Sequence, residues 1–314
     1  ADTGLAFVLV IVGAAAALAA NALGIGSGAL TGPGFYPFIL SCLLIAVGAA
    51  LLLRAALLNK MGAPHWSLTG VAVIAAVLFG ADWAWSQLGR TVALRFGPAE
   101  LLAITVLKLA LIVALARASR LRAFGMVLLG LLVASVGVDV ATGVERFESL
   151  ADGISAVTVL LGFAVADGAL GLAAPSLLLA SYGRKIGRPL TAPVSPSVGV
   201  PVRLAGVLLI AAALSAAFIL DGTGWPAGQI VVVAVFGIAC QLLGWNRPVL
   251  LVALLLGPAL EENLRRTLLI SRGSVGSLFT RPISGPIIGC AVAVLVAAIA
   301  LSAWRVFAGR KAAL

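Results

Sequence analysis

Four charged residues fall within six positions at the end of a long apolar run, in a chain of which only 10% is charged. The run, LLVALLLGPALEENLRRTLL, covers Leu250–Leu269, and its second half carries two acids, an amide and two bases: Glu261, Glu262, Asn263, Arg265 and Arg266. On a helix, each glutamate faces an arginine at i,i+4, in the favourable order for pairing. Two interpretations stay open. The segment is either a self-neutralised helix end at the headgroup layer, or the polar lining of a solute path beside a helix break at Gly257-Pro258.

In the second interpretation, Glu262, Asn263 and Arg265 line the path of a charged solute. Arg281, which precedes Pro282, is a further candidate because a guanidinium can bind a carboxylate through two parallel hydrogen bonds. The phosphate of a lipid headgroup is the alternative partner of Arg281.

Three ionisable residues lie inside apolar runs: Asp82, Lys108 and Asp167. Charged groups at membrane depth are costly and usually have a partner or a function, so all three are ion-coupling candidates. Asp82 and Lys108 can pair between neighbouring helices. Asp167 either titrates with a coupling proton or belongs to a helix kink near Gly168.

Two glycine-containing loops are further candidates. The stretch SVGVDVATGVERF holds Asp139, Thr142, Gly143 and Arg146, and GIGSGALTGPGFYP holds Gly32, Pro33 and Gly34. A structural turn and a docking site are both open for the first loop, in which pairing of Arg146 with Glu145 or Glu148 competes with docking. The second loop is either a helix-packing turn or a backbone nest for an anion.

The remaining chemistry-bearing residues do not form a catalytic set. The single histidine, His65, stands in a loop beside Trp66, and Cys42, Cys240 and Cys290 lie in apolar runs. We therefore expect no metal site, no cofactor and no enzymatic activity. The sequence also lacks a phosphate-binding P-loop pattern, so ATP is not expected to drive it.

The elements that carry these residues are membrane spans. The chain is 62% hydrophobic, with a mean hydropathy of +1.19. Apolar stretches of about 20 residues, each long enough to cross a bilayer as a helix, recur along its length. We predict an all-α, polytopic transmembrane helical bundle of about 10 spans, the ninth of which either crosses fully or is broken and re-entrant. The predicted spans are Leu5–Leu23, Phe35–Leu53, Leu68–Leu88, Ala99–Ala116, Phe124–Val138, Ile154–Ala174, Leu204–Leu220, Gln229–Trp245, Val249–Leu269 and Ile283–Trp304.

The net charge of +10 does not indicate nucleic acid, because the basic residues are dispersed between the apolar runs. Most arginines and lysines fall in alternate connections and in the C-terminal tail, which places both termini in the cytoplasm. The N-terminus, ADTGLAF, has no basic residue, so the first span is expected to be retained rather than cleaved as a signal peptide. Breaks in the apolar pattern predict blocks at 1–60, 66–180 and 204–314, the last two joined by a proline-rich cytoplasmic linker at 181–203.

Three stretches resemble the tripartite tricarboxylate transporter family. LTGPGFYP, at 30–37, resembles a turn of its small membrane subunit, whereas LLGLLVASVGVDVATGVERF, at 128–147, and LGPALEENLRRTLLISRGSVGSLFTRPISG, at 256–285, resemble signatures of its large permease subunit. The resemblance implies a fusion of a two-helix small-subunit-like segment with a shortened large subunit. Two glycine-proline motifs of the large subunit are absent from this sequence.

The resemblance implies a permease component of a secondary transporter in a bacterial inner membrane. Its substrate would be a small organic anion such as a tricarboxylate or dicarboxylate, and its drive a proton or sodium gradient. The expected partners are a periplasmic solute-binding protein, the lipid bilayer and a further membrane subunit. The absent motifs favour the alternative, a non-transporting membrane assembly or docking protein derived from the same family.

Overall fold

The structure is a computed structural model that describes residues 2–24, 26–27, 30–57, 97–116, 120–139, 144–146, 153–174, 196–221, 225–243 and 245–311. Its helices are α1 (Asp2–Ala22), α2 (Phe35–Leu57), α4 (Pro98–Leu115), α5 (Arg120–Ala134), α6 (Ala156–Ala173), α8 (Pro196–Asp221), α9 (Trp225–Leu243), α10 (Arg247–Ile270), α11 (Ser277–Thr280) and α12 (Ser284–Lys311). Two short hairpins, β1 (Gly26–Ser27) with β2 (Leu30–Thr31) and β3 (Gly137–Val138) with β4 (Glu145–Arg146), are the strands of the described part. The prediction of an all-α, multi-pass membrane protein is confirmed.

Each predicted span that the structure describes overlaps a helix; Leu68–Leu88 lies outside the described residues. Within those residues, five helices contain an apolar window long enough to cross a bilayer: α1, α2, α4, α6 and α12. Shorter apolar stretches lie in α8 and α9. α10 is long enough to cross, at 24 residues, but it carries the charged segment of 261–266.

One expected helix end is wrong. The fifth span was expected to reach Val138, but α5 ends at Ala134 and Val138 pairs with Glu145 in the β3–β4 hairpin. Of the two alternatives for the ninth span, the structure has the unbroken one, because α10 is one continuous helix through Gly257 and Pro258. A proline in a helix removes one backbone donor and need not end the helix when the flanking turns are held by packing. Leu254 and Leu260, which lie about one turn before and half a turn after Pro258, are both buried.

One hydrophobic core joins α1, α2, α4, α5 and α10, with buried side chains such as Leu9, Leu44, Leu102, Met126 and Leu250. Val159 and Phe163 of α6 belong to the same core, and α6 packs mainly on α8 and α9. At the α6–α8 crossing the two backbones touch: a Cβ added at Gly168 would lie 2.7 Å from the Gly206 carbonyl oxygen. Small residues that permit such approach are a common means of packing helices in a bilayer.

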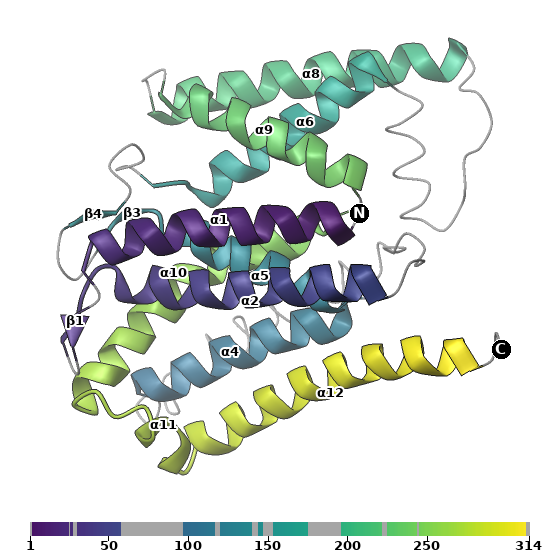
Figure 1. Ribbon diagram of the computed structural model, residues 1–314. Helices are drawn as coiled ribbons and strands as arrows, with labels where there is room; N and C mark the ends of the chain where they lie inside the picture. Colours follow the sequence, from purple (N-terminus) through teal and green to yellow (C-terminus); the bar gives the residue numbers. More distant parts are fainter. Residues whose placement is uncertain are drawn as a thin grey trace.

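The start of α1 and the end of α12 lie at the same end of the bundle, and β1, β3, β4 and α11 lie at the opposite end (Figure 1). We call the latter the loop end. α10 runs toward the loop end and α12 runs back from it (Figure 1). This course agrees with α10 as a full crossing rather than as a re-entrant hairpin.

Candidate functional site

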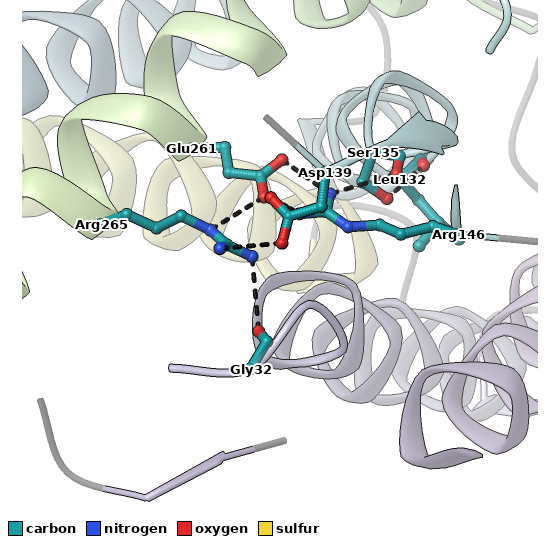
Figure 2. Close-up of polar contacts among 7 residues, drawn as sticks. All are labelled: Gly32, Leu132, Ser135, Asp139, Arg146, Glu261 and Arg265. Atoms are coloured by element: carbon teal, nitrogen blue, oxygen red, sulfur yellow. Dashed lines mark hydrogen bonds and ion pairs between the residues drawn. The ribbon is translucent and has the colours of Figure 1, made fainter. Parts of the chain in front are cut away.

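A buried cluster of charged side chains at the loop end joins three separate segments of the chain (Figure 2). Asp139 follows β3, Arg146 is in β4, and Glu261 and Arg265 are on α10. The fifth member is the backbone carbonyl of Gly32, in the turn that precedes α2. We call these five groups the loop-end cluster.

Each carboxylate of the loop-end cluster binds both guanidinium groups. Glu261 accepts two hydrogen bonds from Arg146, one of them at 3.0 Å between Nη1 and Oε2, and a third from Arg265 Nε at 3.1 Å. Asp139 lies 3.0 Å from Arg146 Nη2 through Oδ1 and 3.0 Å from Arg265 Nη1 through Oδ2.

The two arginines also donate to backbone carbonyls. Arg265 Nη2 donates to the Gly32 oxygen at 3.3 Å, and Arg146 Nη1 donates to the Ser135 oxygen at 3.2 Å. The cluster therefore ties α10 to the turn before α2 and to the end of α5.

The four charged side chains of the loop-end cluster are buried and their charges balance. The exposed fractions of the side chains are 3% for Arg146, 2% for Asp139, 9% for Arg265 and 13% for Glu261. Two positive and two negative charges cancel, so each desolvated ion has compensating partners. Burial alone lowers the pKa of Arg146, but its hydrogen bonds and attraction to Glu261, and then to Asp139, outweigh burial and raise its pKa above the ordinary value. The arginine stays charged and bound.

Local structure explains how the chain brings these groups together. In the β3–β4 hairpin Gly137 pairs with Arg146, and the Asp139 N–H donates to the Val144 carbonyl at 2.9 Å, which places Asp139 beside Arg146. Gly137 has a φ of 121°, a conformation that favours glycine. On α10, the four-residue spacing puts Glu261 and Arg265 on one face, as the sequence predicted.

The structure assigns Arg146 different partners from those expected. Glu145 is exposed, and Arg146 turns inward to Asp139 and Glu261. Glu148, the other expected partner, lies outside the described residues. Glu261 itself was absent from the predicted path residues, although its i,i+4 relation to Arg265 was visible in the sequence. Its long-range bond to Arg146 spans 115 positions and leaves no local signal.

The other residues of the charged segment face away from the cluster. Glu262 and Arg266 pair with each other at the surface, with 53% and 61% of their side chains exposed. Asn263 donates to the Ala259 carbonyl of its own helix at 2.7 Å. α10 thus has one charged pair directed inward and one directed outward.

Arg281 lies apart from the loop-end cluster, between α11 and α12. Its Nη1 is 3.8 Å from Glu100 Oε1, and Glu100 in turn accepts the Gly97 N–H at 2.8 Å at the start of α4. With 32% of its side chain exposed, Arg281 is more open than either arginine of the cluster. Its pairing with Glu100 was not predicted.

Among the ion-coupling candidates, Asp167 has a partner that the sequence did not indicate. Arg247, at the start of α10, lies 2.9 Å from Asp167 on α6 and stands over the Phe163 ring, 5.3 Å from its centroid. Lys108 lies in α4. Asp82, its expected partner, lies outside the described residues, as do Thr142 and Gly143 of the first loop. In the second loop, Gly34 is buried and Pro33 is partly exposed.

The described residues contain no group of three or more His, Cys, Asp or Glu side chains that could hold a metal ion. A cavity of about 130 Å³ lies between α4, α5 and α12 and is lined by apolar side chains, among them Val113, Phe124, Leu128 and Leu295. A carboxylate needs hydrogen-bond donors or cations, so this cavity does not provide an anion site.

Comparison with known proteins shows a family similarity over part of the chain. Residues 63–186 match the tripartite tricarboxylate transporter TctA family. The match covers about two fifths of the chain and includes the loop of Asp139 and Arg146. It does not extend to residues 1–60 or to α10, so the resemblances noted there stay predictions. Over residues 63–186 the chain is therefore similar to a tricarboxylate transporter family.

Two proteins of Agrobacterium vitis are also similar to this chain. The "Uncharacterized 52.8 kDa protein in TAR-I ttuC' 3'region" is 44% identical over 82 residues, which are 24% of this chain and 16% of that protein. The "Uncharacterized protein in TAR-II ttuC' 3'region" is 27% identical over 100 residues, 32% of this chain and 41% of that protein. The chain thus spans under half the length of either relative. No solved structure matches it.

Proposed function

We propose that the chain is a permease component of a secondary transporter that carries small organic anions, such as tricarboxylates or dicarboxylates, across the bacterial inner membrane. The observation that carries the proposal is the family match over residues 63–186, set in a bundle of apolar helices. A tripartite system also implies a solute-binding protein and a further membrane component as partners. The coupling ion is a proton or sodium.

The orientation that we propose has both termini in the cytoplasm and the loop end toward the periplasm. It is supported by the arginines at the other end of the bundle, among them Arg120 and Arg122 at the start of α5 and Arg247 at the start of α10. In this orientation the loop-end cluster and Arg281 lie on the side from which a periplasmic binding protein delivers solute.

Among the candidate path residues, Arg281 is the one that we assign to the solute. It is partly exposed, and its distance of 3.8 Å to Glu100 is longer than a direct hydrogen bond, so a carboxylate can compete for it. Arg265 is bound on three sides inside the loop-end cluster, and we assign it a structural role. We assign ion coupling to Asp167, whose partner Arg247 would be released when an ion binds the carboxylate.

A second candidate is a non-transporting assembly or docking protein of the same family. The neutralised loop-end cluster favours it, because Asp139 and Glu261 already occupy both buried guanidinium groups. The fusion that we propose, a two-helix segment at 1–60 with permease-like blocks at 66–180 and 204–314 around the linker at 181–203, is compatible with either candidate.

Uptake into proteoliposomes tests the proposal. The purified chain is reconstituted with and without the solute-binding protein, and labelled citrate and several dicarboxylates are offered with a proton or a sodium gradient. Uptake that depends on the chain and on one gradient is the expected result, and Arg281→Gln should lower it while Arg266→Gln, on the exposed pair, should not. Association with the binding protein without uptake under any gradient favours the docking role instead.

A further inference from the structure

We propose that the α1–α2 hairpin is a separately docked unit, held on the rest of the bundle by noncovalent contacts that keep it in place when the chain is cut after α2. The inference does not depend on transport, because it concerns only how the hairpin is held. It rests on two independent contacts, an apolar one along α5 and a polar one at the loop end.

The hairpin is first of all packed on itself. α1 and α2 lie side by side along their length (Figure 1), and their backbones come close: a Cβ added at Gly48 would lie 3.0 Å from the Ala6 carbonyl oxygen, and one added at Gly13 would lie 3.1 Å from the Ser41 carbonyl oxygen. The turn between them is closed by its own hydrogen bond, from the Gly34 N–H to the Gly24 carbonyl at 3.1 Å. The hairpin therefore has the internal packing of a unit that can stay folded while its attachment to other helices changes.

The apolar contact is a close approach of α5 to both helices of the hairpin. A Cβ added at Gly125 of α5 would lie 2.6 Å from Leu9 Cδ1 and 3.4 Å from Val47 Cγ1. Gly125 thus lets the α5 backbone fit between one side chain of α1 and one of α2. In a bilayer, such packing is a main source of helix association, since lipid already solvates apolar side chains.

The polar contact is the hydrogen bond from Arg265 to the Gly32 carbonyl, at 3.3 Å. Arg265 is held in position for this bond by Asp139 and Glu261, neither of which belongs to the hairpin. The donor is charged and the site is largely buried, which makes a hydrogen bond of this kind stronger than one between neutral groups. The loop-end cluster thus binds the turn between α1 and α2.

The experiment is cleavage of the folded full-length chain. A protease site with flexible Gly/Ser spacers is inserted between residues 60 and 66, the protein is purified in mild detergent and cut, and size exclusion shows whether the hairpin elutes with the remaining helices. We expect the wild-type hairpin to stay bound. Arg265→Gln should speed its release by about tenfold or more, the factor for losing a hydrogen bond to a charged group. The adjacent Arg266→Gln, whose side chain is 61% exposed, is the matched control and should behave as wild type.

A second pair of variants tests the apolar contact separately, so that the result does not depend on whether Arg265→Gln folds. Gly125→Leu should release the cut hairpin faster, whereas Gly289→Leu on α12, where an added Cβ meets nothing within 4 Å, should not. Release of the wild-type hairpin on cutting, while the uncut protein stays monodisperse, would overturn the proposal. So would equal retention of the cut hairpin in Gly125→Leu and Gly289→Leu.

Discussion

Two neighbouring glutamates on α10 provide a sharp prediction, because Glu261 is buried in the loop-end cluster and Glu262 is at the surface. Glu261→Gln keeps the shape of the side chain and removes its charge. Arg146 and Arg265 then share the single negative charge of Asp139, inside a site where both guanidiniums are over 90% buried. Removing one partner of a buried ion pair costs about 3–5 kcal/mol, since the other charge is left uncompensated.

Glu262→Gln is the matched control on the same helix. Its pair with Arg266 is more than half exposed, so the loss is about 0–1 kcal/mol after screening by solvent. With a melting shift of roughly 2–4 °C per kcal/mol, Glu261→Gln should lower the apparent melting temperature by on the order of 10 °C. Glu262→Gln should change it by a few degrees at most.

The assay is fluorescence-detected size exclusion after heating in detergent, with both variants and the double variant Glu261→Gln/Arg265→Gln. The double variant removes one charge of each sign from the cluster, so it should recover part of the stability lost in Glu261→Gln. Equal destabilisation by Glu261→Gln and Glu262→Gln would refute the assignment of Glu261 to a buried, charge-balanced cluster.

Three further predictions address topology, packing and the α6–α10 contact. In a cysteine-free background, a single cysteine at Thr31 should be labelled from the periplasm, whereas one at Ser195 should be labelled only after permeabilisation. The reverse pattern would mean that the proposed orientation is inverted. Gly168→Leu should reduce the yield of monodisperse protein far more than a leucine at an open glycine of α12, since its Cβ alone would lie 2.7 Å from a backbone oxygen of α8. Asp167→Asn and Arg247→Gln should each destabilise the chain, and a double-mutant cycle in thermal melts should show a coupling energy of about 0.5–3 kcal/mol between them. Strictly additive effects would show that the two side chains do not interact.

The helices could be predicted from the sequence because their signal is local and strong. A run of about 20 apolar residues has few alternatives to a membrane helix. The end of α5 was predicted too far along the chain, because Gly137 and Val138 continue the apolar pattern. Only their pairing with β4 shows that the helix has ended before them. The effect of Pro258 stayed open because the packing of the flanking turns is not visible in a single sequence.

Two of the five groups of the loop-end cluster could be placed from helical spacing, which puts Glu261 beside Arg265. The contacts of this pair with the other segments could not be predicted, because Arg146 reaches Glu261 across 115 positions and Arg265 reaches the Gly32 carbonyl across 233. The Asp167–Arg247 pair, 80 positions apart, is a similar case. Such partners are chosen by the packing of distant helices, and the carbonyl of a glycine carries no side-chain signal at all.

The most direct test of the transport proposal is solute counterflow, since it needs no knowledge of the coupling ion. Proteoliposomes containing the chain are loaded with a high concentration of unlabelled citrate or a dicarboxylate and diluted into a trace of the labelled compound, with pH and sodium equal on both sides. A carrier path predicts a transient accumulation of label above the external concentration, absent from liposomes without protein and reduced by Arg281→Gln. Reconstituted, monodisperse protein that exchanges none of these anions, with the solute-binding protein present or absent, would contradict the proposal that this chain provides the path.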